Sequence, residues 1–490
     1  MLFNSLEFAL FLPIVFLLYW FVFQRNLKWQ NFFILIASCV FYGWWDWRFL
    51  ILIVFTSFCS WGSGLLIQHA DNKEFTPPFP RVNLLKNAKF ILVSNIVINF
   101  LILGIFKYYN FFIESFVTAF AAVGVHLQMH TLKIILPVGI SFYTFQALSY
   151  SIDVYRNKLE PTHDIIAFFA FVSFFPQLVA GPIERATKLL PQFYIKRNFD
   201  YSKAADGMRQ ILWGLFKKIV VADNCAAYVN QVFGDYQHQS GFTLLLGAIF
   251  FAFQIYGDFS GYSDIAVGTA RLFGFNLMRN FNVPYFSRDI GEFWRRWHIS
   301  LTGWFRDYIY IPLGGSRVSK PKIIRNTFII FLISGFWHGA NWTFIVWGAF
   351  HALLFLPLIL LDKNRKNTNT VAENCILPTK KEIFQMGITF LLVTAGWVFF
   401  RAESIGGAVD YLAGICNTSL FEVSSEVSPP SKCFAFILLM LSVEWLNRNK
   451  QHGLEISQIN RWLRRFIYIV LILCIVMFCG ENEQFIYFQF

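Results

Sequence analysis

Two histidines stand 40 residues apart in segments rich in aromatic residues: His298 in FWRRWHISLTGWFRDYIYIPLGG and His338 in SGFWHGANW. A neutral histidine can take the proton from a hydroxyl group as that hydroxyl attacks an acyl carbonyl. Its ordinary pKa of about 6.5 leaves it basic near neutral pH. General-base assistance of this kind typically contributes about 10² to 10⁴ in rate. The two side chains therefore suit general acid–base chemistry.

The segment that leads to His338 is a short apolar run, 327–337. At about 1.5 Å per residue it reaches roughly 16 Å, about half of a hydrocarbon core near 30 Å thick. The chain then turns at 339–341 and returns through the apolar residues 342–361. We expect a re-entrant hairpin with His338 near mid-membrane, where an ionisable side chain is costly and is a functional candidate. The alternative is a histidine that only packs across helices.

Covalent and metal-dependent routes have no clear motif in the sequence. GxSxG, HExxH and CxxC patterns are all missing, so no metal site is expected. Ser334 lies one helical turn before His338 and could serve as an acyl-accepting relay. No third group that would orient Ser334 is evident, which makes direct transfer the simpler scheme.

The composition is typical of a polytopic membrane protein. Of the 490 residues, 56% are hydrophobic, 20% are aromatic and 14% are charged, and the mean hydropathy is +0.50. A soluble domain would carry more charge. Apolar stretches lie near 5–23, 31–46, 49–67, 89–106, 109–125, 134–152, 165–180, 205–223, 241–258, 383–400, 433–446 and 466–479. With the hairpin, they predict an all-α polytopic membrane protein with about 11 to 13 membrane segments. We expect a single domain over 1–490 whose core lies at about 134–361.

The net charge of +12 could indicate a nucleic-acid partner, but its placement argues against one. Lys and Arg concentrate in alternate loops, which is typical of the cytoplasmic loops of membrane proteins. The pattern predicts an N-terminus outside, and the segments 275–326 and 363–382 inside. The hairpin that bears His338 would therefore enter from the cytoplasm.

The segment 289–310 has the pattern of an amphipathic helix in the cytoplasmic membrane interface. Its arginines lie away from the apolar face. That face consists of Phe293, Trp297, Leu301, Trp304 and Tyr308. His298 shares a stripe with Trp294 and Phe305, so we expect it to point toward the apolar flank.

Seven sequence blocks occur in an order that resembles one protein family. They are MLFNSLEFALFLPIVFLLYW, LPVGISFYTFQALSYSIDVYR, FFPQLVAGPIER, QIYGDFSGYSDIAVG, FWRRWHISLTGWFRDYIYIPLGG, SGFWHGANWTFIVWG and the terminal FIYFQF. Together they resemble the membrane-bound O-acyltransferases, and specifically the bacterial branch of polysaccharide O-acetyltransferases that includes the membrane subunit of alginate O-acetylation. The resemblance implies a central tunnel that contains both His338, as the catalytic histidine, and His298.

The resemblance also implies a location, a donor and partners. It implies a multi-pass protein of the bacterial cytoplasmic (inner) membrane that passes acyl groups from the cytoplasm to an exported polysaccharide, with a separate extracytoplasmic acetyltransferase as partner. Acetyl-coenzyme A, or another acyl thioester, would be the donor substrate, with no bound cofactor. His338 would be the general base, while His298 would orient or polarise the acyl carbonyl or support the tunnel wall.

Positive charge near the expected cytoplasmic mouth has two interpretations. Arg295, Arg296 and Arg306 could bind the phosphates of the donor, because guanidinium groups match phosphate geometry. They could equally follow the topology rule and contact anionic lipid. Further candidates for the tunnel or for substrate contact are Asp258, Ser260, Tyr262, Asp264, Trp337 and Asn341.

Two of these candidates, Asp258 and Asp264, are carboxylates at the end of an apolar span, so they need polar or charged partners. Asp258 and Asp264 either bind polar groups of the substrates or form ion pairs that fix the fold. The arginines considered for such pairs are Arg271, Arg288 and Arg306.

Two other functions remain open at this point. The first is D-alanyl transfer to teichoic acid from a carrier protein, within the same family, although the chain length and the terminal FIYFQF favour the acetylation branch. The second is a transporter or flippase, which would also have about a dozen spans. Internal inverted repeats would support transport, and no second WHGA-like element is visible.

Overall fold

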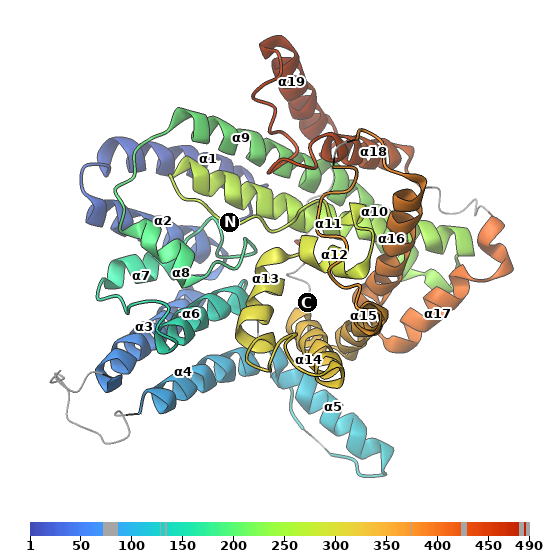
Figure 1. Cartoon of the computed structure of the whole chain (residues 1–490), viewed down its shortest axis with the longest axis horizontal. Helices are drawn as coiled ribbons and strands as arrows, with labels where there is room; N and C mark the ends of the chain where they lie inside the picture. Colours follow the sequence, from blue (N-terminus) through green and yellow to red (C-terminus); the bar gives the residue numbers. More distant parts are fainter. Residues whose placement is uncertain are drawn as a thin grey trace. The chain divides into compact units, whose positions relative to one another are not determined.

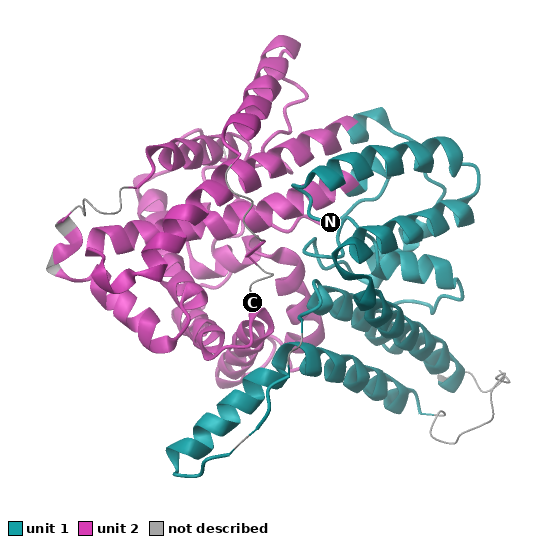
Figure 2. Ribbon diagram, turned by 180° about the vertical axis from the view of Figure 1, so that it is seen from behind, with its two compact units in different colours: residues 1–204, 270–277 teal, residues 205–269, 278–490 magenta. Residues whose placement is uncertain are grey.

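The computed structural model describes residues 1–71, 87–127, 129–132, 135–373, 375–422, 429–479 and 485–486. Every regular element in those residues is a helix (Figure 1). The chain divides into two compact units, one formed by 1–204 with 270–277 and the other by 205–269 with 278–490 (Figure 2). The predicted all-α class is confirmed.

The first unit consists of short and medium helices. They are α1 (Leu6–Leu17), α2 (Leu27–Asp46), α3 (Leu50–Asp71), α4 (Ala88–Leu103), α5 (Tyr109–Ala122), α6 (Ile140–Tyr155), α7 (Ile165–Val172) and α8 (Ala186–Leu189). The apolar stretch expected at 165–180 forms only the eight residues of α7, and the prediction of a span there was wrong. Pro176 follows, and a helix usually ends before a proline, because the ring excludes the preceding residue from the helical region.

The second unit contains both predicted histidines. Its helices are α10 (Asp223–Gly234), α12 (Ile290–Arg296), α13 (Ile299–Phe305), α14 (Lys320–His338), α15 (Trp342–Leu360), α16 (Lys380–Arg401), α17 (Ile405–Ile415), α18 (Ser431–Leu446) and α19 (Arg461–Met477), with most of α9 (Tyr201–Leu215) and α11 (Gly241–Leu272). Five helical stretches of the described chain are long and apolar enough to cross a membrane: 27–70, 88–122, 241–272, 342–360 and 380–401. The larger expected number of membrane segments stays a prediction.

The hairpin predicted around His338 is formed by α14 and α15, each 19 residues long. Glycines allow their backbones to approach closely. A methyl group on Gly335 would collide with the carbonyl oxygen of Phe344, and one on Gly348 with that of Phe331. Because α14 begins at Lys320, it extends beyond the apolar run, and the depth of His338 in the membrane stays a prediction.

A second pair of glycine contacts joins α9 to α11. A methyl group on Gly214 would meet the carbonyl oxygen of Gly261 at 2.5 Å, and one on Gly268 would meet that of Gly207 at 2.5 Å. The seven-residue spacing on both helices keeps these small residues at one interface. The close approach brings the π-helical turn after α9, Phe216–Ala222, against the middle of α11.

The single amphipathic helix expected over 289–310 is interrupted, and this part of the prediction was wrong. Helix α12 ends at Arg296, Trp297 is extended, and His298 adopts the left-handed conformation with φ 44° before α13 begins. The expected apolar face is inside the protein, since Phe293, Trp297 and Leu301 are at most 2% exposed. Periodicity could not reveal one left-handed residue, because the side chains on both sides of the break are apolar.

The glycine contacts of the hairpin give the first testable prediction. Gly335→Ala and Gly348→Ala should each destabilise the protein by about 1 to 3 kcal/mol, because the added methyl group forces two backbones apart. Gly387→Ala on α16 is the matched control, since a methyl group there has no neighbour within 4 Å, and alanine should be neutral or stabilising. Thermal unfolding in detergent measures all three variants. Equal melting temperatures for the hairpin variants and the control would contradict the prediction.

Candidate active site

His338 ends α14 with its imidazole buried and one ring nitrogen hydrogen-bonded. Its Nδ1 lies 2.6 Å from the carbonyl oxygen of Ser334, one turn earlier. A carbonyl can only accept a hydrogen bond, so the proton of the neutral ring is on Nδ1. The lone pair is then on Nε2, which is the form that a general base requires.

His298 is held in the same tautomer by a different partner. Its Nδ1 lies 3.1 Å from Asn280 Oδ1. The backbone N–H of Ser300 also donates to that oxygen, at 3.2 Å, and this fixes which end of the Asn280 amide is the oxygen. Burial, reinforced by the neighbouring His338, lowers the pKa of His298 well below its ordinary value. The ring is therefore neutral, with its proton on Nδ1.

The two histidines share an aromatic enclosure. Their ring centroids are 6.5 Å apart, and the rings are nearly perpendicular. Trp337 lies 6.0 Å from His298 and 5.0 Å from His338, and Phe259 of α11 packs edge-on against His298 at 4.7 Å. The structure thus brings together three predicted residues from two separate motifs: His298 from one, and Trp337 and His338 from the other.

A third buried histidine, His351 of α15, was missed in the sequence. The indole N–H of Trp294 lies 3.4 Å from His351 Nδ1. Trp347 connects the histidines, with its ring 5.0 Å from His338 and 5.1 Å from His351. An ionisable residue inside an apolar span was the available signal.

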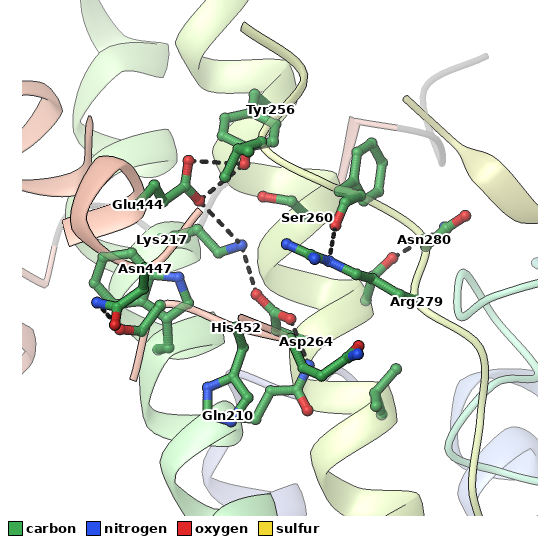
Figure 3. Close-up of a pocket in the computed structure, with 17 residues that line it drawn as sticks. Gln210, Lys217, Tyr256, Ser260, Asp264, Arg279, Asn280, Glu444, Asn447 and His452 are labelled. Carbon is green, nitrogen blue, oxygen red and sulfur yellow. Dashed lines mark hydrogen bonds and ion pairs between the residues drawn. The ribbon is translucent and has the colours of Figure 1, made fainter. Parts of the chain in front are cut away.

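A polar cavity lies in the second unit, beside α11 (Figure 3). Its lining includes Asn280, the partner of His298. The lining also includes Ser260 and Gln210, whose Oγ and Oε1 atoms are buried without a hydrogen-bond partner. Buried polar atoms of this kind are normally satisfied by water or a ligand. The cavity is therefore suited to a polar ligand.

Charged side chains of both signs line this cavity, as Figure 3 shows. Lys217 Nζ lies 2.5 Å from Asp264 and 3.9 Å from Glu444, and the Tyr256 hydroxyl donates to Glu444 at 2.8 Å. Arg279 donates to two backbone carbonyls, those of Phe281 and Lys450. The formal charges of the two cations and two carboxylates cancel.

Asp258, one of the predicted tunnel residues, contacts a lysine and a backbone N–H. It lies 2.7 Å from Lys218 Nζ, and its other oxygen accepts from the backbone N–H of Ile486 at 2.7 Å. Tyr262, on the same helix, packs against Phe485 at 4.9 Å. Two candidate residues therefore hold part of the terminal FIYFQF block against α11.

The ion-pair partners expected for the two aspartates were wrong. Lysines pair with them, whereas Arg288 pairs with Glu292 and Arg306 with Asp307. Lys217 and Lys218 come close because the glycines of α9 and α11 let these helices approach. The contact between α9 and α11 was not predicted from the sequence. Two lysines in an apolar stretch could have indicated it, because buried lysines need partners.

The three arginines proposed for donor phosphates occupy different environments. Arg296 is buried and pairs with Glu292 at 2.8 Å. Arg295 donates to the carbonyl oxygens of Asn364 and Asn367, at 2.8 and 2.7 Å. The Arg306 side chain is 64% exposed and pairs with Asp307. Phosphate binding by these residues stays a prediction.

Asn341, also among the substrate candidates, caps α15. Its Oδ1 accepts from the backbone N–H of Thr343 at 3.0 Å, and its Nδ2 donates to the carbonyl of Glu403 at 3.1 Å. An N-cap of this kind stabilises the helix start. These contacts explain why asparagine follows the turn at Gly339 and Ala340, and a role in substrate binding stays a prediction.

Two buried histidines with their ring protons held on Nδ1, near a polar cavity in an all-helical protein, are suited to acyl transfer. The chain belongs to the membrane-bound O-acyltransferase family, whose family model matches residues 92–395. It is therefore a multi-pass membrane protein and an O-acyltransferase. The sequence-based assignment to this family is confirmed.

Three relatives match different shares of the chain. The chain is 41% identical over 406 residues to "Probable alginate O-acetylase AlgI" of Pseudomonas aeruginosa, with 83% of this chain and 73% of the relative covered. It is 32% identical over 540 residues to "Peptidoglycan O-acetyltransferase" of Helicobacter pylori, with 100% and 98% covered. "Teichoic acid D-alanyltransferase" of Bacillus subtilis is 27% identical over 287 residues, with 54% and 69% covered.

Proposed function

We propose that this protein transfers an acetyl group from acetyl-coenzyme A to hydroxyl groups of an exported polysaccharide, with His338 as the general base. The observation that carries the proposal is the Nδ1–H hydrogen bond from His338 to the Ser334 carbonyl, because it leaves the basic lone pair on Nε2. The names of the alginate and peptidoglycan relatives support both the acetyl group and the polysaccharide acceptor.

The proposed reaction is a direct transfer. The acceptor oxygen attacks the thioester carbonyl carbon while Nε2 of His338 takes the hydroxyl proton. The carbon–sulfur bond then breaks, and the imidazolium returns the proton to the thiolate, so a thiol leaves. The Ser334 carbonyl accepts from Nδ1–H throughout and stabilises the transient positive ring. The aromatic enclosure limits competing hydrolysis by keeping water away from the thioester.

We assign the polar cavity to the amide-bearing arm of the donor. Most of the side chains that line the cavity are polar. Its formal charges cancel, and Ser260 and Gln210 offer unused polar atoms, so it matches a neutral chain of amide donors and acceptors. Because Asn280 lines the cavity and also accepts a hydrogen bond from His298, an arm bound there would approach His298. Arg295, Arg296 and Arg306 remain the proposed partners of the donor phosphates.

We further infer a setting in the bacterial inner membrane with an extracytoplasmic acetyltransferase as partner. The relatives are named for O-acetylation of alginate and of peptidoglycan. If the acceptor of this protein lies outside the cytoplasm, an acetyl group from a cytoplasmic donor must be passed outward. D-alanyl transfer is the less favoured acyl chemistry, because the teichoic acid relative matches only 54% of this chain. Turnover that depends on a carrier protein would favour that alternative.

Removal of the proposed base gives the second prediction. His338→Ala should lower acetyl transfer from acetyl-coenzyme A by about 10²-fold or more in purified protein, because the hydroxyl proton then has no acceptor. His163→Ala is the control, since that exposed histidine lies outside the site. Release of free thiol and ester formed on a polysaccharide acceptor are measured together. Full transfer activity in His338→Ala would exclude the proposed role.

Filling the cavity gives the third prediction. Ser260→Leu places apolar volume where the donor arm is proposed to bind, and should raise the KM for acetyl-coenzyme A about ten-fold. Acetyl-N-acetylcysteamine, a thioester that lacks most of the arm, should be used with less than about two-fold change. Ser431→Leu, on an exposed position of α18, is the matched control. Equal effects on both donors would remove the cavity from donor binding.

A further inference from the structure

Asn280 lies in the loop before α12, and its side chain is hydrogen-bonded to His298. Three donors converge on its Oδ1: His298 Nδ1 at 3.1 Å, the Ser300 backbone N–H at 3.2 Å and the Ser300 hydroxyl at 2.9 Å. On its other side, Nδ2 donates to Ser263 Oγ at 3.1 Å. The side chain is 2% exposed. Its orientation is therefore fixed from both ends of the amide.

The backbone supports the same arrangement. The N–H of Ile299 donates to the carbonyl of Asn280 at 2.9 Å, so the loop and the start of α13 are joined by main-chain and side-chain bonds. His298 itself has φ 44°, a conformation that costs a non-glycine residue about 1 to 3 kcal/mol and persists only where surrounding contacts hold it. Asn280 supplies such contacts at the strained residue and at the two residues that follow it, Ile299 and Ser300.

We infer that Asn280 is a positioning residue that fixes the tautomer of His298, so that this histidine offers a hydrogen-bond acceptor, Nε2, to the reacting groups. The inference rests on the proposed function. It also narrows the role of His298, because a neutral ring with its proton on Nδ1 cannot donate from Nε2 to an acyl carbonyl. Because the proton of the attacking hydroxyl goes to His338, His298 would instead accept a hydrogen bond from a second hydroxyl of the acceptor and so orient the acceptor.

Charged and titratable groups around His298 are few and have partners. His338 faces it from α14. On α11, Asp264 pairs with Lys217, Asp258 pairs with Lys218, and Tyr262 packs against Phe485. Arg279, which precedes Asn280, donates to backbone carbonyls. A new charge at position 280 would therefore act on His298 at closer range than any of these.

The fourth prediction uses two substitutions at position 280 and a matched pair two residues away. Asn280→Ala removes the acceptor and should lower kcat about ten-fold or more, with little change in the KM for acetyl-coenzyme A. Asn280→Asp keeps an acceptor but adds negative charge, which raises the pKa of His298. The ring would then become protonated at a higher pH than in the wild type. The acid limb of the kcat profile should therefore move to higher pH by about one unit or more.

Asn282→Ala and Asn282→Asp are the controls. Asn282 lies in the same loop, and its buried Oδ1 has no hydrogen bond, so both variants should keep the wild-type kcat and pH profile. Melting temperatures of all four variants identify any loss of folding. An unshifted acid limb in Asn280→Asp, or a shift of equal size in Asn282→Asp, would overturn the inference.

A spectroscopic readout separates this inference from the proposed function. Nitrogen-15 spectra of histidine-labelled protein distinguish a ring N–H from a bare ring nitrogen, and comparison with His298→Asn assigns the signal. We expect an Nδ1–H ring at His298 in the wild type and loss of that single form in Asn280→Ala. An unchanged tautomer in Asn280→Ala would overturn the inference, even if acetyl transfer itself were absent from the wild-type protein.

Discussion

A buried imidazole can act on a substrate through one nitrogen only if the proton on its other nitrogen has a fixed acceptor. Both central histidines meet this condition. His338 donates to a backbone carbonyl of its own helix, and His298 donates to Asn280. Neither acceptor needs to ionise, so the arrangement costs less in an apolar interior than a carboxylate partner would. The neighbouring helices position these two acceptors.

Close contacts between glycines determine where the helices meet. On α14 and α15 they set the turn that carries His338, and on α9 and α11 they bring two lysines against two aspartates. An apolar environment offers little hydrophobic drive for helix association, so close backbone packing and satisfied polar groups must supply it. The ion pairs beside the cavity would be costly if any member lost its partner. They therefore also maintain the polar lining of the cavity.

The sequence was informative where chemistry is carried by a short motif and less so where it depends on packing. The helical class, the hairpin and the two histidines followed from apolar runs, the turn after His338 and seven ordered blocks. The break at His298 could not be predicted, because one left-handed residue leaves the apolar pattern unchanged. The lysine partners of Asp258 and Asp264 were also missed, since they come from a helix contact with residues 40 and 47 positions earlier in the chain.

The central claim is that His338 is the base for esterification of an exported glycan. The most direct measurement is the O-acetyl content of that glycan, by mass spectrometry, in the native host with His338→Ala at matched protein abundance. The account predicts that the glycan is still exported but has lost its ester. An unchanged ester content would contradict the role of His338, and loss of the glycan itself would contradict a function limited to acyl transfer.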